Sequence, residues 1–281
     1  MKRVMNREKG PLPILSPGIT LDRIQPGGRF GPNGEVRWET PGGQVWMDTF
    51  TLGNPDDDFQ LTIPEIRMPA NQYWPLHWHD CWIAVIVIEG TCMVGDWWME
   101  PGDVMITAPG VEYGPLLNGP SGCQLFEIFA QDHLSPGGYS PEYHDHPTLL
   151  TTARPFIPRS QLNSRNHGNQ VLPNAGVEGI ITGRFTPGAR WDLGDKDDPQ
   201  RGILACKRID KSERRAEHIY RDWHAIVVRE GRVSLGMKVL EKDDVLVIEP
   251  NSAVPAIVGL SDETILMEVS RTAAGADPIF T

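Results

Sequence analysis

The sequence predicts an all-β protein that consists of two tandem copies of one barrel-forming unit. Three observations support this fold class. The chain of 281 residues matches itself at an interval of 141 residues, its apolar runs are short and β-branched, and its 29 glycines and 25 prolines provide many turns. The length also suits two domains of ordinary size better than one.

The internal repeat is clearest between positions 77 and 113, which align without a gap on positions 218 to 254. Eleven of these 37 positions are identical, and the matched residues include the glycines Gly90 and Gly231. The same register pairs three further residues with identical ones: Arg67 with Arg208, Leu125 with Leu266, and Glu127 with Glu268. A gap-free match that keeps glycines in register indicates a duplicated structural unit.

Each copy contains the same succession of predicted strands. A β-branched run closed by Glu-Gly comes first, then two apolar runs around a central Gly, as in a hairpin, and then a strand that a Pro ends. These segments occupy 82–90, 91–103 and 104–110 in the first copy, and 224–231, 232–244 and 245–251 in the second. Many short strands at close spacing favour a sandwich or a barrel.

We expect an N-terminal domain in residues 1–150 and a C-terminal domain in residues 151–281. The stretch 151–170 is polar and contains two prolines, which is typical of a link between domains, so we expect that link within about residues 150–175. The first ~40 residues are rich in Gly and Pro. We expect them to wrap around a barrel or to form an edge strand beside the other copy.

Composition excludes several classes of partner. The net charge is −11 and no basic cluster stands out, so neither nucleic acid nor an anionic membrane surface is an expected partner. The four cysteines are dispersed and form no C-x-x-C pair, which favours a reducing, cytoplasmic setting. No secretory signal is visible, and the longest apolar run, 82–88, is too short to cross a bilayer.

Two motifs in the first copy resemble those of the cupin superfamily. His77, His79, Ile83 and Gly90 have the spacing of the first motif, H-x-H, three or four residues, Glu, six residues, Gly. Gly102, Ala108-Pro109-Gly110 and Tyr113 have the spacing of the second, Gly, five residues, Pro-x-Gly, two residues, His. With the second copy included, the resemblance covers most of residues 60–130 and 200–270. It implies a bicupin, with two tandem jelly-roll barrels.

The ligand positions of both copies differ from the family pattern, in which two His, a Glu and a final His hold a divalent metal. In the first copy Ile83 replaces the Glu and Tyr113 replaces the last His. The second copy has His218, but it has Tyr220 at the second His position and His224 at the Glu position. Val254 replaces its last His, and Asp243 replaces the motif Gly. The resemblance therefore implies a complete ligand set in neither copy.

His77 and His79 are the principal candidate metal ligands. Residues two apart on a strand point to one face, so their imidazoles converge in a barrel interior and could bind a divalent metal. Tyr113 is a candidate third ligand or acid–base group, and Glu127 is a candidate catalytic residue on a later strand. Packing or structural hydrogen bonding is the alternative role for each of these side chains.

Weaker candidates complete the predicted site. Arg67 could bind a substrate carboxylate with two parallel hydrogen bonds, although a structural ion pair is an equal alternative, and Gln124 is a further substrate candidate. In the second copy, the alternatives are a second metal site and the remnant of one. Its candidate residues are His218, Tyr220 and His224.

The favoured function is a metal-dependent enzyme with dioxygenase-like chemistry on a small organic substrate that carries a carboxylate or carbonyl group. We expect one divalent metal ion per chain, with Fe first and Mn, Ni, Zn or Cu as alternatives. A non-redox lyase, isomerase or cyclase that uses Tyr113 as acid or base is a second hypothesis. A non-catalytic binding or sensor protein is a third. The chain is expected to act as a monomer or homodimer.

Overall fold

The computed structural model describes most of the chain outside the predicted link. The described residues are 2–5, 14–24, 36–40, 43–54, 56–74, 77–79, 81–94, 97–111, 113–114, 116–130, 138–139 and 180–280. Side chains are described for these residues except 2–5, 14, 36–40, 43–44, 77 and 138–139. The side chain of His77 and the predicted link at about 150–175 therefore lie outside the description.

The chain divides into two compact units that are discontinuous in sequence. The first, called the N-terminal barrel, comprises Met1–Asn6, Glu35–Thr49 and Ile63–Phe185. The second, called the C-terminal barrel, comprises Arg7–Gly34, Phe50–Thr62 and Thr186–Thr281. These bounds differ from the expected 1–150 and 151–281, because segments near the start and the middle of the chain are assigned to the opposite copy.

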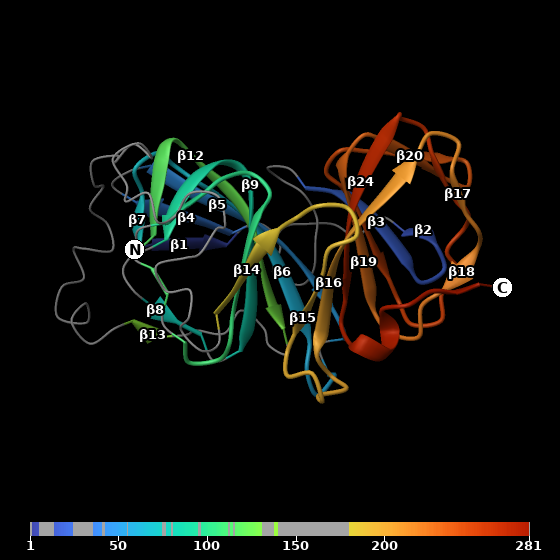
Figure 1. The fold of residues 1–281 in the computed structure, drawn as a ribbon, viewed down its shortest axis with the longest axis horizontal. Coiled ribbons are helices and arrows are strands. Elements are labelled where there is room, and N and C mark those ends of the chain that lie inside the picture. The colour runs from blue at the N-terminus through green and yellow to red at the C-terminus, as the bar shows by residue number, and fades with distance from the viewer. Residues whose placement is uncertain are drawn as a thin grey trace. The chain divides into compact units, whose positions relative to one another are not determined.

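The N-terminal barrel is built on one 10-stranded sheet (Figure 1). Its strand order is β1 (Lys2–Met5), β4 (Val36–Thr40), β5 (Gly43–Leu52), β6 (Leu61–Met68), β12 (Leu116–Ala130), β9 (Trp82–Val94), β11 (Asp103–Thr107) and β14 (Ile180–Arg184). Strand β7 (Tyr73–Trp74) pairs with β12, and β10 (Trp97–Met99) pairs with β9. Strands β8 (His77–Trp78) and β13 (Gly138–Tyr139) form a separate pair.

The C-terminal barrel contains three described sheets. The seven-stranded sheet has the order β15 (Arg190–Leu193), β16 (Gly202–Asp210), β24 (Glu263–Ser270), β19 (His224–Glu230), β22 (Asp244–Ile248), β3 (Ile19–Arg23) and β2 (Ile14–Ser16). The four-stranded sheet has the order β17 (Arg214–Arg215), β23 (Ile257–Gly259), β20 (Arg232–Leu235) and β21 (Lys238–Glu241). Strands β18 (His218–Ile219) and β25 (Ile279–Phe280) pair, and a 3-10 helix spans Ala273–Gly275.

The predicted repeat is confirmed in the pairing of strands. Glu127 lies opposite Val85 between β12 and β9, and Glu268 lies opposite Ile226 between β24 and β19. Each pair of strands also has a register shift at the matching place, beyond 125 in one barrel and beyond 266 in the other. The two copies therefore share their register as well as their strand order, and the all-β prediction is correct.

A glycine is required at the same bend in both copies. Gly90 and Gly231 both have φ of +71°, where a side chain is strained. A Cβ atom on Gly90 would lie 2.1 Å from the carbonyl oxygen of Gly122, and one on Gly231 would lie 2.4 Å from that of Glu263. The backbone conformation and the close approach of the neighbouring strand explain why the sequence repeats this glycine.

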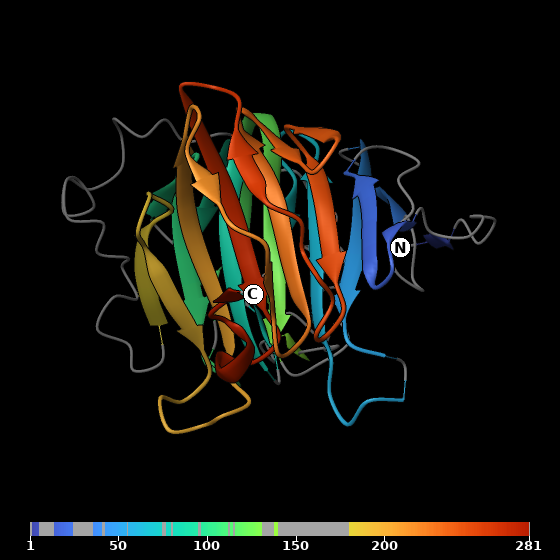
Figure 2. The same ribbon diagram turned by 90° about the vertical axis from the view of Figure 1, so that its right-hand side faces the viewer.

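Each barrel receives an edge strand from the part of the chain that precedes the other barrel. Strand β3 pairs with β22 so that Arg23 faces Asp244, and β14 pairs with β11 so that Arg184 faces Asp103. The ion pairs match: Arg23 Nε lies 2.7 Å from Asp244 Oδ1, and Arg184 Nη1 lies 2.6 Å from Asp103 Oδ1. In Figure 2 the blue β3 lies at the edge of the orange and red sheet. The expectation of an edge strand beside the other copy is thus confirmed.

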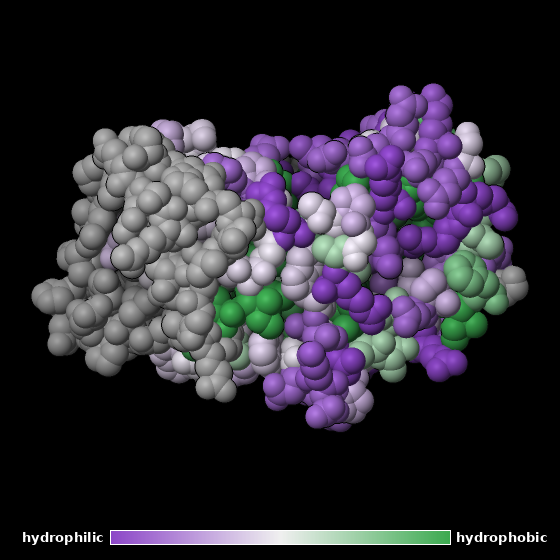
Figure 3. Space-filling view, in the orientation of Figure 1, coloured by the Kyte–Doolittle hydropathy of each residue, from purple (hydrophilic) through white to green (hydrophobic). Residues whose placement is uncertain are grey.

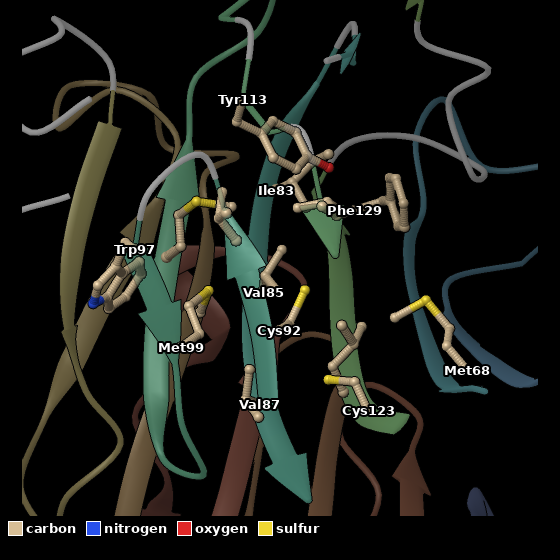
Figure 4. Packing of buried hydrophobic residues seen from close by; sticks show 14 of the residues in the cluster. Met68, Ile83, Val85, Val87, Cys92, Trp97, Met99, Tyr113, Cys123 and Phe129 are labelled. Atoms are coloured by element: carbon tan, nitrogen blue, oxygen red, sulfur yellow. The ribbon is translucent and has the colours of Figure 1, made fainter. Parts of the chain in front are cut away.

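The interior of each barrel is a cluster of buried apolar side chains at matching positions. Figure 4 shows this cluster in the N-terminal barrel, where Val85, Val87 and Cys92 point between the strands, with Tyr113 and Phe129 toward one end. The corresponding positions in the C-terminal barrel include Ile226, Val228 and Val233. Burial of these side chains is the main stabilising contribution within each unit.

The described surface is mainly polar. Hydrophilic side chains predominate over the C-terminal barrel in the face shown by Figure 3. Among the described residues, the exposed large apolar side chains are Ile181, Met237, Val239 and Phe280. No helix within the described part of the chain has the length and apolar character that spanning a membrane requires.

Candidate functional site

The N-terminal barrel places His79 beside two residues of its interior cluster. The His79 ring stacks against Tyr113, with ring centroids 6.1 Å apart and planes inclined by 27°. It also meets Phe129 edge-on at a centroid distance of 5.2 Å. Tyr113 and Phe129 are buried, whereas His79 is half-buried. His79 and Tyr113, two of the predicted site residues, therefore come together at one end of this barrel.

His77 occupies β8, where it pairs with Tyr139 of β13. Its side chain lies outside the described residues, so the direction of the second imidazole in the H-x-H pair stays a prediction. The strand parity that predicts a shared face for residues 77 and 79 is unaffected.

Glu127 points into the same interior. It lies between Leu125 and Phe129 on β12 and opposite Val85 on β9, and all three of these neighbours belong to the interior cluster. Because side chains alternate along a strand, Glu127 shares their face. Its side chain is half-buried, and burial raises its pKa to about 7. A carboxyl group that titrates near neutrality is suited to acid–base chemistry.

Gln124 and Arg67 point away from this interior. Gln124 lies opposite the exposed Glu89, and its neighbours Cys123 and Leu125 belong to the interior cluster, so Gln124 faces outward. Arg67 Nε donates to Glu65 Oε1 at 2.9 Å, and its guanidinium group lies 4.7 Å from the centre of the Trp46 ring. The expected role of Arg67 beside the barrel mouth is therefore replaced by its alternative, a structural ion pair.

The matching end of the C-terminal barrel holds a dense polar cluster that is closed to solvent. Tyr220 stacks on His224 with ring centroids 3.7 Å apart and planes inclined by 6°, and it meets His218 edge-on at 5.1 Å. The exposed fractions are 0% for His218 and Tyr220, 1% for His224 and 4% for Glu268. The second-site candidates of the sequence thus lie together, but none of them has more than a trace of accessible surface.

Hydrogen bonds define the proton positions of the two histidines in this cluster. His218 Nδ1 lies 2.8 Å from the carbonyl oxygen of Ala216, which can only accept, so Nδ1 carries the proton. His224 Nδ1 lies 2.6 Å from Ser270 Oγ. Burial lowers the pKa of both histidines, which keeps them neutral near pH 7. The Nε2 atom of each makes no hydrogen bond to a described residue.

Glu268 is the electrostatic centre of the same cluster. It forms a buried ion pair with Arg215, and its Oε2 lies 3.7 Å from His224 Nε2. Burial alone would raise the pKa of Glu268, but His224 and Arg215 outweigh it and lower the pKa to about 2. Burial likewise opposes the charge of Arg215, yet Glu268 holds its pKa above the ordinary value. This carboxylate is ionised and fully occupied by protein partners.

Sequence reasoning missed Arg215 and Ser270, which complete this cluster. Their repeat counterparts are Trp74 and Phe129, and the counterpart of His224 is Ile83. The signal was present in the alignment, because three apolar residues of one copy face three polar residues of the other around a glutamate that both copies share. That pattern indicates that one glutamate has protein partners and the other lacks their equivalents.

The two donor sets differ in their fit to a metal. Among the described residues, no group of three or more His, Cys, Asp or Glu side chains could hold a metal ion. In the C-terminal barrel the Tyr220 ring packs against both histidines and Arg215 already neutralises Glu268, so that set does not fit a cation. The N-terminal set, an H-x-H pair with a phenol and a carboxyl group on the interior face, fits by its donor chemistry.

Solved structures of bicupin enzymes have the same fold as this chain. A "putative dioxygenase" from Nostoc punctiforme is 14% identical with a TM-score of 0.61, over 99% of this chain and 91% of its own. Oxalate decarboxylase from Bacillus subtilis is 12% identical with a TM-score of 0.55, over 84% and 74% respectively.

The oxalate decarboxylase of Lactobacillus farciminis, solved as a formate complex, is 17% identical with a TM-score of 0.54, over 84% and 82%. No protein-family model and no curated protein matches the sequence. The similarity establishes two tandem jelly-roll barrels of the cupin type, as the sequence motifs predicted, and it concerns the fold alone.

Proposed function

We propose that this bicupin is a metal-dependent enzyme with one active site, located in the N-terminal barrel, that acts on a small organic molecule. One observation carries the proposal. At matching positions, His79 and Glu127 keep accessible surface in the N-terminal barrel, whereas Tyr220 and Glu268 are closed off in the C-terminal barrel. A reacting site must admit substrate, so the accessible copy is the better candidate.

His77 and His79 would hold the metal, with Tyr113 as a further donor. When bound, a divalent metal would supply Lewis-acid or redox chemistry. We expect iron, with Mn, Ni, Zn or Cu as alternatives. Among the structural neighbours, Bacillus subtilis oxalate decarboxylase is described as having Mn(II) centres. The aromatic contacts that His79 makes with Tyr113 and Phe129 would orient its imidazole and exclude water from one side of it.

Glu127 would move a proton at its carboxyl oxygens. Its pKa of about 7 allows the carboxylate to accept a proton from a substrate, and the carboxylic acid to return it, near neutral pH. The apolar surroundings of Glu127 provide the burial that produces this shift. We favour dioxygenase-like chemistry, for which the metal supplies the reaction with oxygen.

The raised pKa of Glu127 also favours a second candidate function, a non-redox lyase, isomerase or cyclase. These reactions depend on proton transfer, and either Tyr113 or Glu127 could act as the acid or base. Oxygen consumption separates the two candidates. A dioxygenase consumes oxygen only with substrate and metal together, whereas equal turnover without oxygen would establish the non-redox reaction.

The first test is the metal content of the full-length protein, measured by elemental mass spectrometry. We expect about one equivalent per chain, lost in the double variant His77→Ala/His79→Ala. The matched control, His218→Ala/Tyr220→Phe in the C-terminal barrel, should keep the metal. Loss of metal in the control and its retention in the first variant would contradict the proposal. Absence of metal in all three proteins, even after reconstitution, would instead favour a metal-free binding protein.

A further inference from the structure

The N-terminal barrel directs its described cationic side chains away from the candidate site. Within this unit, Arg67 and Arg184 are the Arg or Lys residues whose side chains the structure describes. Arg67 is held by Glu65 on the outward face, and Arg184 is held by Asp103. Arg184 Nη2 also donates to the carbonyl oxygen of Pro101 at 3.2 Å. Neither guanidinium group is available to pair with an anion in the interior.

The interior itself presents apolar surface around one carboxyl group. Val85, Leu125 and Phe129 flank Glu127 on the inward face, and His79 and Tyr113 lie at the same end. Within the part of the chain that the structure describes, no ion pair is recorded for Glu127. A negatively charged ligand would therefore meet a carboxyl group and apolar side chains.

The C-terminal barrel shows what this fold requires to hold a buried anion. There the ionised Glu268 is accompanied by Arg215, His224 and Ser270, which supply a positive charge and hydrogen-bonding groups. The N-terminal barrel has Trp74, Ile83 and Phe129 at the three corresponding positions. Trp74 packs against the apolar cluster, and the other two residues belong to it. These replacements remove the features that would make an anion stable there.

Resting on the proposed function, we propose that the substrate of the N-terminal barrel is an uncharged, largely apolar molecule with a hydroxyl or carbonyl group, rather than a carboxylate. Its apolar part packs against Val85, Leu125 and Phe129. Its hydroxyl donates a hydrogen bond to the Glu127 carboxylate, or its carbonyl accepts one from the protonated form. Such a ligand satisfies the carboxyl group without adding a second charge to the interior.

The proposal narrows the range of substrates that the sequence left open. A carboxylated substrate was expected on the assumption that Arg67 lies at the barrel mouth, and the structure places Arg67 on the outward face. The fold similarity to oxalate decarboxylases does not transfer their substrate. A small dicarboxylate would carry two charges into a site whose described residues offer no cation for either of them.

The test is isothermal titration calorimetry of the full-length protein, as isolated, with three probes at about pH 8, where 4-methylphenol is uncharged. The probes are 4-methylphenol, 4-methylbenzoate and oxalate, so the first two share one apolar body and differ in charge. We expect 4-methylphenol to bind at least ~10-fold more tightly than 4-methylbenzoate, and oxalate to bind least. The Glu127→Gln variant should narrow the ratio between the first two probes to within about threefold, because the repelling charge is gone.

The matched control is Gln124→Glu, which adds a carboxylate to the outward face of the same strand and should leave the ratio unchanged. Equal or tighter binding of 4-methylbenzoate or oxalate would overturn the proposal. So would a ratio that Glu127→Gln does not change, or the absence of saturable binding of 4-methylphenol. Metal content is measured on the same samples. Metal-free protein that prefers 4-methylphenol would contradict the proposed function alone, and metal-loaded protein that prefers an anion would contradict this inference alone.

Discussion

Glu127 and Glu268 occupy the same place on the same strand of the two barrels, yet their carboxyl groups have opposite pKa shifts. Burial raises the pKa of Glu127 to about 7, whereas His224 and Arg215 lower that of Glu268 to about 2. The strand pairing around the two residues is identical. The difference therefore comes from side chains alone, and it shows that one backbone can carry a satisfied structural carboxylate in one copy and a reactive carboxyl group in the other.

The largest expected effect is on stability, and it should appear in only one barrel. Glu268→Gln removes the charge that neutralises the buried Arg215, and we expect it to cost about 3–5 kcal/mol of unfolding free energy. Glu127→Gln keeps the shape of a side chain without a recorded protein partner, and its cost should stay within about 1 kcal/mol. Urea unfolding followed by circular dichroism measures both variants. Equal losses would mean that Glu127 also has a structural partner.

The pH dependence of stability should separate the same two residues. The pKa of Glu268 falls from 4.5 to about 2 on folding, so its contribution, about 3 kcal/mol, is present above pH 4.5 and is lost as the pH falls toward 2. The pKa of Glu127 rises from 4.5 to about 7, so stability is greatest below pH 4.5 and falls by up to about 3 kcal/mol as the pH rises to 7.

Urea unfolding of metal-free protein across this pH range tests the two windows. Relative to the wild type, Glu127→Gln should gain stability between pH 4.5 and 7 and then stay level. The deficit of Glu268→Gln should shrink between pH 4.5 and 2, where the wild type loses the same interaction. The shifts would be misassigned if the two variants changed relative stability in the same window.

The frame of the fold could be predicted from the sequence because it depends on glycines and on alternation. The interval of 141 residues predicts that Val85 matches Ile226 and that Gly90 matches Gly231, and both pairs have matching places in the structure. The exchanged strands were only one of two expected arrangements. Strand β3 corresponds to β14 at an interval of 161 residues, outside the main register, so the repeat could not identify their partners.

The candidate site was harder to predict because it depends on what each side chain meets across the barrel. Arg67 was placed at the mouth by its position before the motif, but strand parity turns it outward with Glu65 while Ile66 packs inward. The pair of Arg215 and Glu268 joins residues 53 positions apart on different sheets. No local pattern predicts such a contact, and only the difference between Arg215 and Trp74 in the repeat hints at it.

The two exchanged strands should respond equally to loss of their arginines. Arg23→Ala and Arg184→Ala each remove a charged hydrogen bond to a buried aspartate, so each should cost about 2 kcal/mol. Because the pairs belong to different units, the double variant should show the sum of the two losses to within about 0.5 kcal/mol. Denaturant unfolding of the three variants measures this. A loss confined to one variant would show that only one exchanged strand is stabilised in this way.

The smallest expected effect comes from making the two interiors more alike. Cys92 is buried in the N-terminal barrel, and its repeat counterpart in the C-terminal barrel is Val233, which is buried at the matching place. Cys92→Val should change the unfolding free energy by less than about 1 kcal/mol, because similar volumes are exchanged at a site that the second copy already fills with Val. The Cys92 Sγ contact with the carbonyl oxygen of Met93, at 3.7 Å, is a weak hydrogen bond that costs little to lose. Metal content and 4-methylphenol binding should be unchanged, because the differences between the barrels lie at the His79 and Glu127 end rather than in the apolar layers. A loss above about 2 kcal/mol would show that the two apolar interiors have diverged as far as the polar ends.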